Sequence, residues 1–300
     1  MFQKRTDLAL EVHELHGNES GITVQELKKG GFNVTVAEVS NGKGEEVSGK
    51  RAGKYITVEM GKIWQKDKDV FERVAKLISE EIQSLLPEKD GCVLVAGLGN
   101  EEITPDSLGP RVVKKLLVTR HIQAIDRELF VDAGFGCVAA LSPGVLGQTG
   151  IESSEIIKSV CNSVRPKCVI VIDSLASRRL NRLASTVQIS DVGISPGSGV
   201  SNRRPELDES TLGAPVISIG VPTVVDAATL AYDLLEEHSG KEDEGFAEVI
   251  ERVLVGSGKD MFVTPKENDV IARETAKLLA CAINMAVHRM EIKEINEFID

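Results

Sequence analysis

The sequence predicts an α/β fold in which helices surround a doubly wound, mostly parallel sheet. Three segments are continuously apolar, as expected of parallel strands that are covered on both faces. They are Cys92–Leu98, Lys167–Asp173 and Pro215–Val221. Helical patterns alternate with these segments, which is the order typical of a doubly wound sheet. The head of the chain has a different strand pattern and predicts a β-rich elaboration at an edge of the same sheet.

The head contains three segments with the two-residue period of a half-exposed strand. Gly21–Leu27 and Phe32–Val39 alternate apolar and polar residues, and the glycine pair at Gly30–Gly31 between them supplies turn chemistry. Residues 41–53 are rich in glycine and charge and predict a loop. Lys54–Met60 is the third alternating strand.

Amphipathic helices are predicted wherever apolar residues recur at intervals of three and four. In Lys66–Leu86 such residues recur throughout, and Pro87 ends the pattern. Further helices are expected over residues 108–117, 152–164, 227–237, 246–254 and 265–288.

Composition excludes several classes of protein. The chain has 300 residues, enough for one large α/β domain, and its formal charge of −11 argues against non-specific nucleic-acid binding. No apolar run approaches the roughly 20 residues that span a bilayer, and the first residues do not resemble a signal peptide. Five scattered cysteines, none in a C-x-x-C pair, predict neither a disulfide framework nor a thiolate zinc site. We expect a soluble cytoplasmic protein with no membrane or nucleic-acid partner.

Two aspartates follow predicted buried strands. Asp106 lies in the loop after Cys92–Leu98, and Asp173 ends the next predicted buried strand. Open α/β sheets bind their ligands beyond the carboxyl ends of the strands. If the two strands are neighbours, both carboxyl groups lie at one crevice.

Such a pair of carboxyl groups has a chemical use. Two carboxylates a few ångströms apart do not both ionise readily, so one keeps its proton and the other loses it. The ionised group can activate a water while the protonated group polarises a peptide carbonyl. The alternative is structural: an aspartate between a strand and a helix is most often a helix N-cap, and helices are plausible after both Asp106 and Asp173.

Other motifs are weaker. Gly97-Leu98-Gly99 begins like a dinucleotide fingerprint, but Glu102 occupies the third glycine position and would repel a pyrophosphate, so a tight turn explains it better. No histidine lies in H-E-x-x-H, and Ser142, Ser153 and Ser198 lie in predicted loops without the G-x-S-x-G elbow.

Long motifs along nearly the whole chain resemble the germination protease family of spore-forming bacteria. The segments that carry the resemblance are Arg5–Glu11, Gly97–Asn100, Thr104–Pro110, Leu141–Glu152, Asp173–Arg178, Ser195–Val200, Ile217–Asp226 and Phe262–Glu267. The resemblance implies a three-layer α/β/α fold of the phosphorylase/hydrolase-like kind, similar to hydrogenase-maturation peptidases. It also implies an aspartic-type endopeptidase, a homotetramer, that degrades small acid-soluble spore proteins in the forespore or spore core. The catalytic pair would be Asp106 and Asp173, and no cofactor or metal site is expected.

The resemblance further implies a zymogen that cuts its own N-terminus after an acidic residue. Thr6-Asp7-Leu8-Ala9 matches such a site, so we expect cleavage between Asp7 and Leu8. Residues 1–7 would then be a short propeptide and residues 8–300 a single peptidase domain. The acidic residue before the cut needs a cationic partner, for which the candidates are Arg178, Arg203 and Arg204, unless they are ordinary surface arginines.

Two other functions remain open at this stage. One is a metal-assisted maturation-type peptidase on the same fold. The other is a non-catalytic binding protein in which Asp106 and Asp173 only cap helices.

Overall fold

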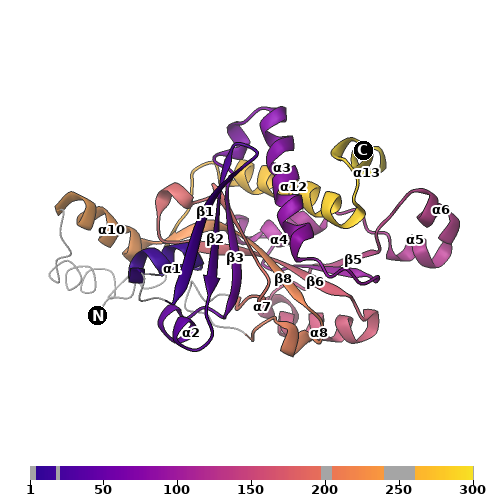
Figure 1. The fold of residues 1–300 in the computed structure, drawn as a ribbon, viewed down its shortest axis with the longest axis horizontal. Coiled ribbons are helices and arrows are strands. Elements are labelled where there is room, and N and C mark those ends of the chain that lie inside the picture. Colours follow the sequence, from indigo (N-terminus) through magenta and orange to yellow (C-terminus); the bar gives the residue numbers. More distant parts are fainter. Residues whose placement is uncertain (1–4, 18–20, 197–204, 240–260, 300) are drawn as a thin grey trace.

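One continuous sheet runs through the molecule (Figure 1). The computed structural model describes residues 5–17, 21–196, 205–239 and 261–299. Within these residues the sheet has nine strands in the order β1-β2-β3-β7-β8-β6-β4-β5, and β9 pairs with β8. The strands are β1 (Ile22–Lys29), β2 (Phe32–Val39), β3 (Gly53–Glu59), β4 (Val93–Gly97), β5 (Val138–Leu141), β6 (Cys168–Ser177), β7 (Thr186–Ser190), β8 (Val216–Asp226) and β9 (Phe262–Val263).

The sheet has a parallel half and an antiparallel half. Strands β5, β4, β6 and β8 are parallel to one another, whereas β7, β3, β2 and β1 continue antiparallel from β8. Strand β6 is buried along almost its whole length, but β1 alternates between buried and exposed positions. A strand covered on both faces needs apolar residues throughout, and an edge strand does not. The predicted β-rich elaboration at the edge of the sheet is therefore confirmed.

Helices cover both faces of the sheet, which confirms the three-layer α/β/α arrangement (Figure 1). Helices α3, α4 and α12 pack on one face, and α1 and α8 pack on the other. The helices are α1 (Ala9–His16), α2 (Lys43–Ser48), α3 (Lys68–Leu85), α4 (Leu108–Val113), α5 (Arg120–Ile125), α6 (Arg127–Asp132), α7 (Leu146–Thr149), α8 (Ser153–Val164), α9 (Glu209–Leu212), α10 (Ala227–Ser239), α12 (Asn268–His288) and α13 (Ile292–Ile299). Short 3₁₀ turns are η2 (Ile63–Gln65), η3 (Thr104–Asp106) and η4 (Leu180–Arg182).

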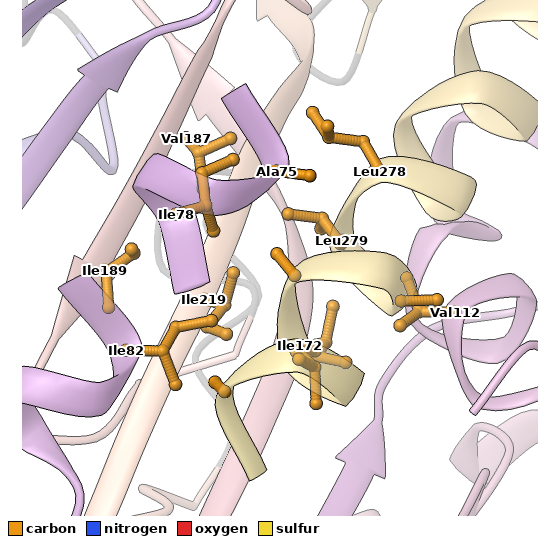
Figure 2. Close-up of a cluster of buried hydrophobic side chains, with 14 of the residues drawn as sticks. Ala75, Ile78, Ile82, Val112, Ile172, Val187, Ile189, Ile219, Leu278 and Leu279 are labelled. Carbon is orange, nitrogen blue, oxygen red and sulfur yellow. The ribbon is translucent and has the colours of Figure 1, made fainter. Parts of the chain in front are cut away.

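The larger core lies between the sheet and α3, α4 and α12 (Figure 2). Helix α3 begins where the Asp67 carboxylate accepts the Val70 N–H at 2.9 Å, and it places Ile78 and Ile82 on the sheet. Burying an isoleucine side chain stabilises a fold by about 1.5–3 kcal/mol. Ile172 of β6 points into this core. Because strand side chains alternate between faces, the next residue, Asp173, faces the layer of α1 and α8.

The second face carries two smaller cores. Helix α8 packs Ile157 and Cys161 on apolar residues of β4 and β6. Helix α1 packs Ala9 and Val12 on the head strands β1, β2 and β3. The start of the chain is thus an integral part of the layer that Asp173 faces.

Two strands continue beyond their predicted ends. Strand β6 was expected to end at Asp173 and β8 at Val221, but their pairing extends to Ser177 and Val225. Polar residues such as Ser174 interrupt the apolar run in the sequence without interrupting the backbone ladder. A register shift between Leu175 and Ala176 bends the extension.

Most other differences concern short elements. Helix α2 lies inside the predicted loop 41–53, and the elements α1, α5, α6, α7, α9, α13, β5, β7 and β9 were not expected. Elements of two to eight residues are too short to show a clear period. The helix predicted at residues 246–254 lies outside the described residues.

Side chains of α12 explain why α4 ends earlier than residue 117. The Asn284 amide accepts the Leu117 N–H at 3.0 Å and donates to the Lys115 carbonyl at 3.3 Å. His288 bridges the Leu117 carbonyl and the Gly136 N–H through its two ring nitrogens. Burial lowers the pKa of His288, which favours the neutral ring that this arrangement requires. These bonds satisfy backbone groups that a longer helix would have paired.

Candidate active site

Asp173 lies within a strand and not at a helix terminus. It is 7% exposed, and β6 continues for four more residues to Ser177. Its Oδ1 accepts the N–H of the next residue, Ser174, at 2.9 Å. The expected helix directly after Asp173 is therefore wrong, and with it the reading of this aspartate as an N-cap. A buried carboxyl group inside a strand needs another explanation.

Asp106 ends the 3₁₀ turn η3, and its carboxylate organises the loop after β4. Its Oδ2 accepts the Asn100 N–H at 2.8 Å, across the loop. Gly99 has a φ of +111°, and a Cβ there would lie 2.0 Å from the Asp106 carbonyl oxygen. Helix α4 has Ser107 as its N-cap, without a side-chain bond. Asp106 therefore closes a loop and does not cap α4, and the glycine at position 99 permits the tight turn predicted there.

The fold brings the two aspartates to neighbouring strands in the parallel half of the sheet. Strands β4 and β6 are parallel neighbours, which is the condition that the sequence left open. The Leu98 N–H donates to the Ile172 carbonyl at 2.8 Å, so the loop that carries Asp106 starts beside Asp173. The turn η3 itself contacts β6 and β8. Ile172 pairs with Gly97, the last residue of β4, so Asp173 in β6 is level with the carboxyl end of β4 and with the start of the loop that carries Asp106. Ligands of α/β enzymes bind beyond the carboxyl ends of the strands.

The N-terminal segment docks on the extension of β6, a few residues beyond Asp173. The Asp7 N–H donates to the Ala176 carbonyl at 2.9 Å, and the Ala176 N–H donates to the Asp7 carboxylate at 2.9 Å. Leu8, on the other side of the predicted cut, is fully buried. Arg5 pairs with Asp226 at 3.3 Å, at the end of β8. The predicted cleavage site is therefore held on β6, the strand that carries Asp173.

The carboxylate of Glu11, on α1, links this N-terminal segment to the residues that follow β6. Its side chain is completely buried and accepts the backbone N–H groups of Arg178 and Arg179 at 2.7 and 3.0 Å. It also accepts the Thr6 hydroxyl and lies 3.4 Å from the guanidinium of Arg182. Sequence analysis missed Glu11, and its only signal was a charged residue among the apolar positions Ala9, Leu10 and Val12.

The three arginines proposed to bind the acidic residue have different positions. Arg178 is 5% exposed, and its Nε lies 2.9 Å from the Asp233 carboxylate. Its guanidinium is thus engaged in a buried ion pair, and its role as a substrate clamp stays a prediction. Arg203 and Arg204 lie outside the described residues. Lys50 also contacts Asp7: its Nζ donates to the Asp7 backbone carbonyl oxygen at 3.0 Å.

Residues 5–17, 21–196, 205–239 and 261–299 hold no group of three or more His, Cys, Asp or Glu residues arranged to bind a metal ion. All five cysteines are free, and burial raises the pKa of Cys92 and Cys168 to about 12. In the same part of the chain, no helix is long and apolar enough to cross a membrane.

Comparison with known proteins gives a consistent family. A family model described as germination protease matches residues 3–244. A germination protease of Caldanaerobacter subterraneus subsp. tengcongensis is 44% identical to this chain and aligns with 98% of each protein. Those of Clostridium tetani and Bacillus subtilis are 42% and 37% identical, covering 99% and 97% of this chain and 99% and 95% of theirs.

One solved structure also aligns with the chain. It is a NiFe hydrogenase maturation protease from Thermococcus kodakarensis, with a TM-score of 0.38 and 15% identity over 68% of this chain and 98% of that one. The fold class is defined by the order of the strands in the sheet and by the helices on its two faces.

Proposed function

Because the chain belongs to the germination protease family, and is therefore a peptidase, we propose that it is an aspartic-type endopeptidase that cleaves small acid-soluble spore proteins. The observation that carries the proposal is that Asp173 lies in β6 level with the carboxyl end of its parallel neighbour β4, and that the loop after β4 carries Asp106. Neither residue caps a helix. The alternative in which both aspartates serve only as helix caps thus loses its structural basis.

The proposed reaction uses one proton shared by the two carboxyl groups. The ionised carboxylate removes a proton from a water, whose oxygen attacks the carbonyl carbon of the substrate peptide. The protonated carboxyl group donates a hydrogen bond to the carbonyl oxygen. When the C–N bond breaks, the leaving nitrogen takes up the proton that the water gave to the carboxylate. A new carboxyl terminus and a new amino terminus result, and the pair returns to its starting charge.

We propose that the chain is made as a zymogen, with residues 1–7 as propeptide and residues 8–300 as a single peptidase domain. Support comes from the docked segment, in which Asp7 exchanges two hydrogen bonds with Ala176 on β6, the strand that also carries Asp173. Seven residues suffice in this proposal, because the segment is bound directly to the extension of β6 and does not have to cover the site by bulk.

The proposal is tested on the full chain by intact mass and N-terminal sequencing during self-processing. We expect one new N-terminus at Leu8 and activity that rises as it forms. The substitution Asp7→Ala removes the acidic side chain and should leave the precursor uncut. A fully active enzyme that keeps Met1 would contradict the proposal.

Assembly and location complete the proposal. We infer a homotetramer that works in the cytoplasm of the forespore or in the spore core. Exposed apolar side chains on α5 and α6 support self-association: Ile125 is 82% exposed and Val131 is 64% exposed. In Figure 1 these two helices project at one end of the molecule, beyond β5 at the edge of the sheet.

A further inference from the structure

Two side chains donate to the carbonyl oxygen of Asp7, which is the acyl oxygen of the bond proposed to be cut. Lys50 Nζ lies 3.0 Å from this oxygen, and Gln188 Nε2 lies 3.3 Å from it. The same Gln188 amide accepts the Ala9 N–H at 2.9 Å through its oxygen. Gln188 thus holds the chain on both sides of the Asp7–Leu8 peptide bond.

The sheet register relates this pair of donors to Asp173. Gln188 of β7 lies opposite Gly220 of β8, and Gly220 lies opposite Asp173 of β6. Residues in one row of a sheet point to the same face. Gln188 and Asp173 therefore project on the same side, two strand spacings or about 10 Å apart at their Cα atoms. Between them Gly220 has no side chain, and the side chain of Leu175 takes that space.

Lys50 is set apart from the surface lysines by its surroundings. It follows α2 and faces two carboxylates, those of Asp7 and Glu11. Burial lowers the pKa of Lys50, while the charges of Asp7 and Glu11 oppose this effect. A cation in a poorly solvated place interacts strongly with any charge that develops near it.

We propose that Lys50 and Gln188 stabilise the oxyanion that forms at the Asp7 carbonyl during self-cleavage, and that Lys50 with the Ala176 N–H selects an acidic residue before the cut. This inference rests on the proposed self-cleavage between Asp7 and Leu8. Groups aimed at the oxygen where charge develops give the largest stabilisation of such a transition state. The acidic side chain is held in turn by the Ala176 N–H on its carboxylate. An arginine clamp is then not required.

The electron balance of the step is that of simple hydrolysis. As the water oxygen bonds to the Asp7 carbonyl carbon, the C=O electron pair moves onto the oxygen that Lys50 and Gln188 contact. The water gives its proton to the ionised carboxyl group of the Asp106–Asp173 pair. When the oxyanion collapses, the C–N bond to Leu8 breaks and the nitrogen takes up that proton. Neither Lys50 nor Gln188 gains or loses a proton in this sequence.

The test compares self-cleavage rates of full-length variants by intact mass. We expect Lys50→Met to slow cleavage by about 10²–10³-fold, Lys50→Arg to recover a large part of the rate, and Gln188→Glu to slow it strongly, since it replaces an amide donor with a carboxylate. Lys28→Met, at an exposed lysine of β1, is the matched control and should cut at the wild-type rate.

A second measurement separates oxyanion stabilisation from mere docking. Arg5 pairs with Asp226 in the docked segment, so we expect trypsin to cut after Arg5 faster when the segment leaves the sheet. The release of residues 1–5 then reports undocking. Slow self-cleavage of Lys50→Met with wild-type protection at Arg5 supports the inference. A rate that falls only in proportion to lost protection, or that does not change, overturns it. If the wild-type chain is never cut after Asp7, the proposed self-cleavage fails and this inference fails with it.

Discussion

Replacing Asp173 or Asp106 with asparagine is expected to reduce peptide hydrolysis by about 10²–10⁴-fold and to leave the fold intact. The loss follows because an amide neither accepts a proton from water nor shares one with a second carboxyl group. The fold is retained because the amide oxygen left by Asp173→Asn still accepts the Ser174 N–H. In the same way, Asp106→Asn still accepts the Asn100 N–H. Cleavage of an acidic peptide and thermal unfolding are measured on each variant.

Asp126 provides the matched control, because it is an aspartate that does cap a helix. Its carboxylate accepts the Leu129 N–H at 2.9 Å at the start of α6. Asparagine caps about as well as aspartate, so Asp126→Asn should keep both activity and stability. Full activity in Asp106→Asn or in Asp173→Asn would contradict the proposed mechanism.

The substitution Glu11→Ala should lower the free energy of unfolding by about 3 kcal/mol, because it leaves buried donors without an acceptor. The N–H groups of Arg178 and Arg179 both donate to this carboxylate, which is fully buried. Loss of the Thr6 contact should also free the N-terminal segment from the sheet. Urea-induced unfolding measures the first effect, and trypsin cleavage after Arg5 measures the second.

Glu14 is the control for this prediction. It lies on the same helix and pairs with Arg182, but it is exposed to solvent. Exposed ion pairs contribute about 0–1 kcal/mol, so Glu14→Ala should change stability little. Equal effects of Glu11→Ala and Glu14→Ala would show that burial does not decide the role of Glu11.

Much of the fold follows from local patterns in the sequence. The apolar runs that became β4 and β6 and the apolar stripe of α3 are regular over enough residues to predict their type. Asp173 lies at the end of such a run, which predicted a position near the carboxyl ends of the strands, where α/β sheets bind their ligands. The sequence did not show that Asp173 lies inside β6. The strand continues beyond it through polar residues, and these are extended because they pair with β8.

The contacts around Asp7 could not be predicted from any local pattern. Asp7 and Ala176 are 169 positions apart, and Lys50 reaches the same segment from a loop of the head. Sequence analysis expected an arginine for the acidic residue, since arginine binds a carboxylate with two parallel bonds. The arginine stays a prediction, and the structure adds Lys50 on the adjoining carbonyl oxygen, a contact that no local pattern in the sequence indicates.

The central claim is that Asp106 and Asp173 act as one pair that shares a proton. The most direct test is the rate of cleavage of an acidic peptide by the processed enzyme, measured from acid to strongly alkaline pH, with unfolding followed in parallel. The claim predicts a rate that rises as the first carboxyl group ionises and disappears once alkaline pH removes the second proton, while the protein stays folded. A rate that stays constant into the strongly alkaline range would contradict it.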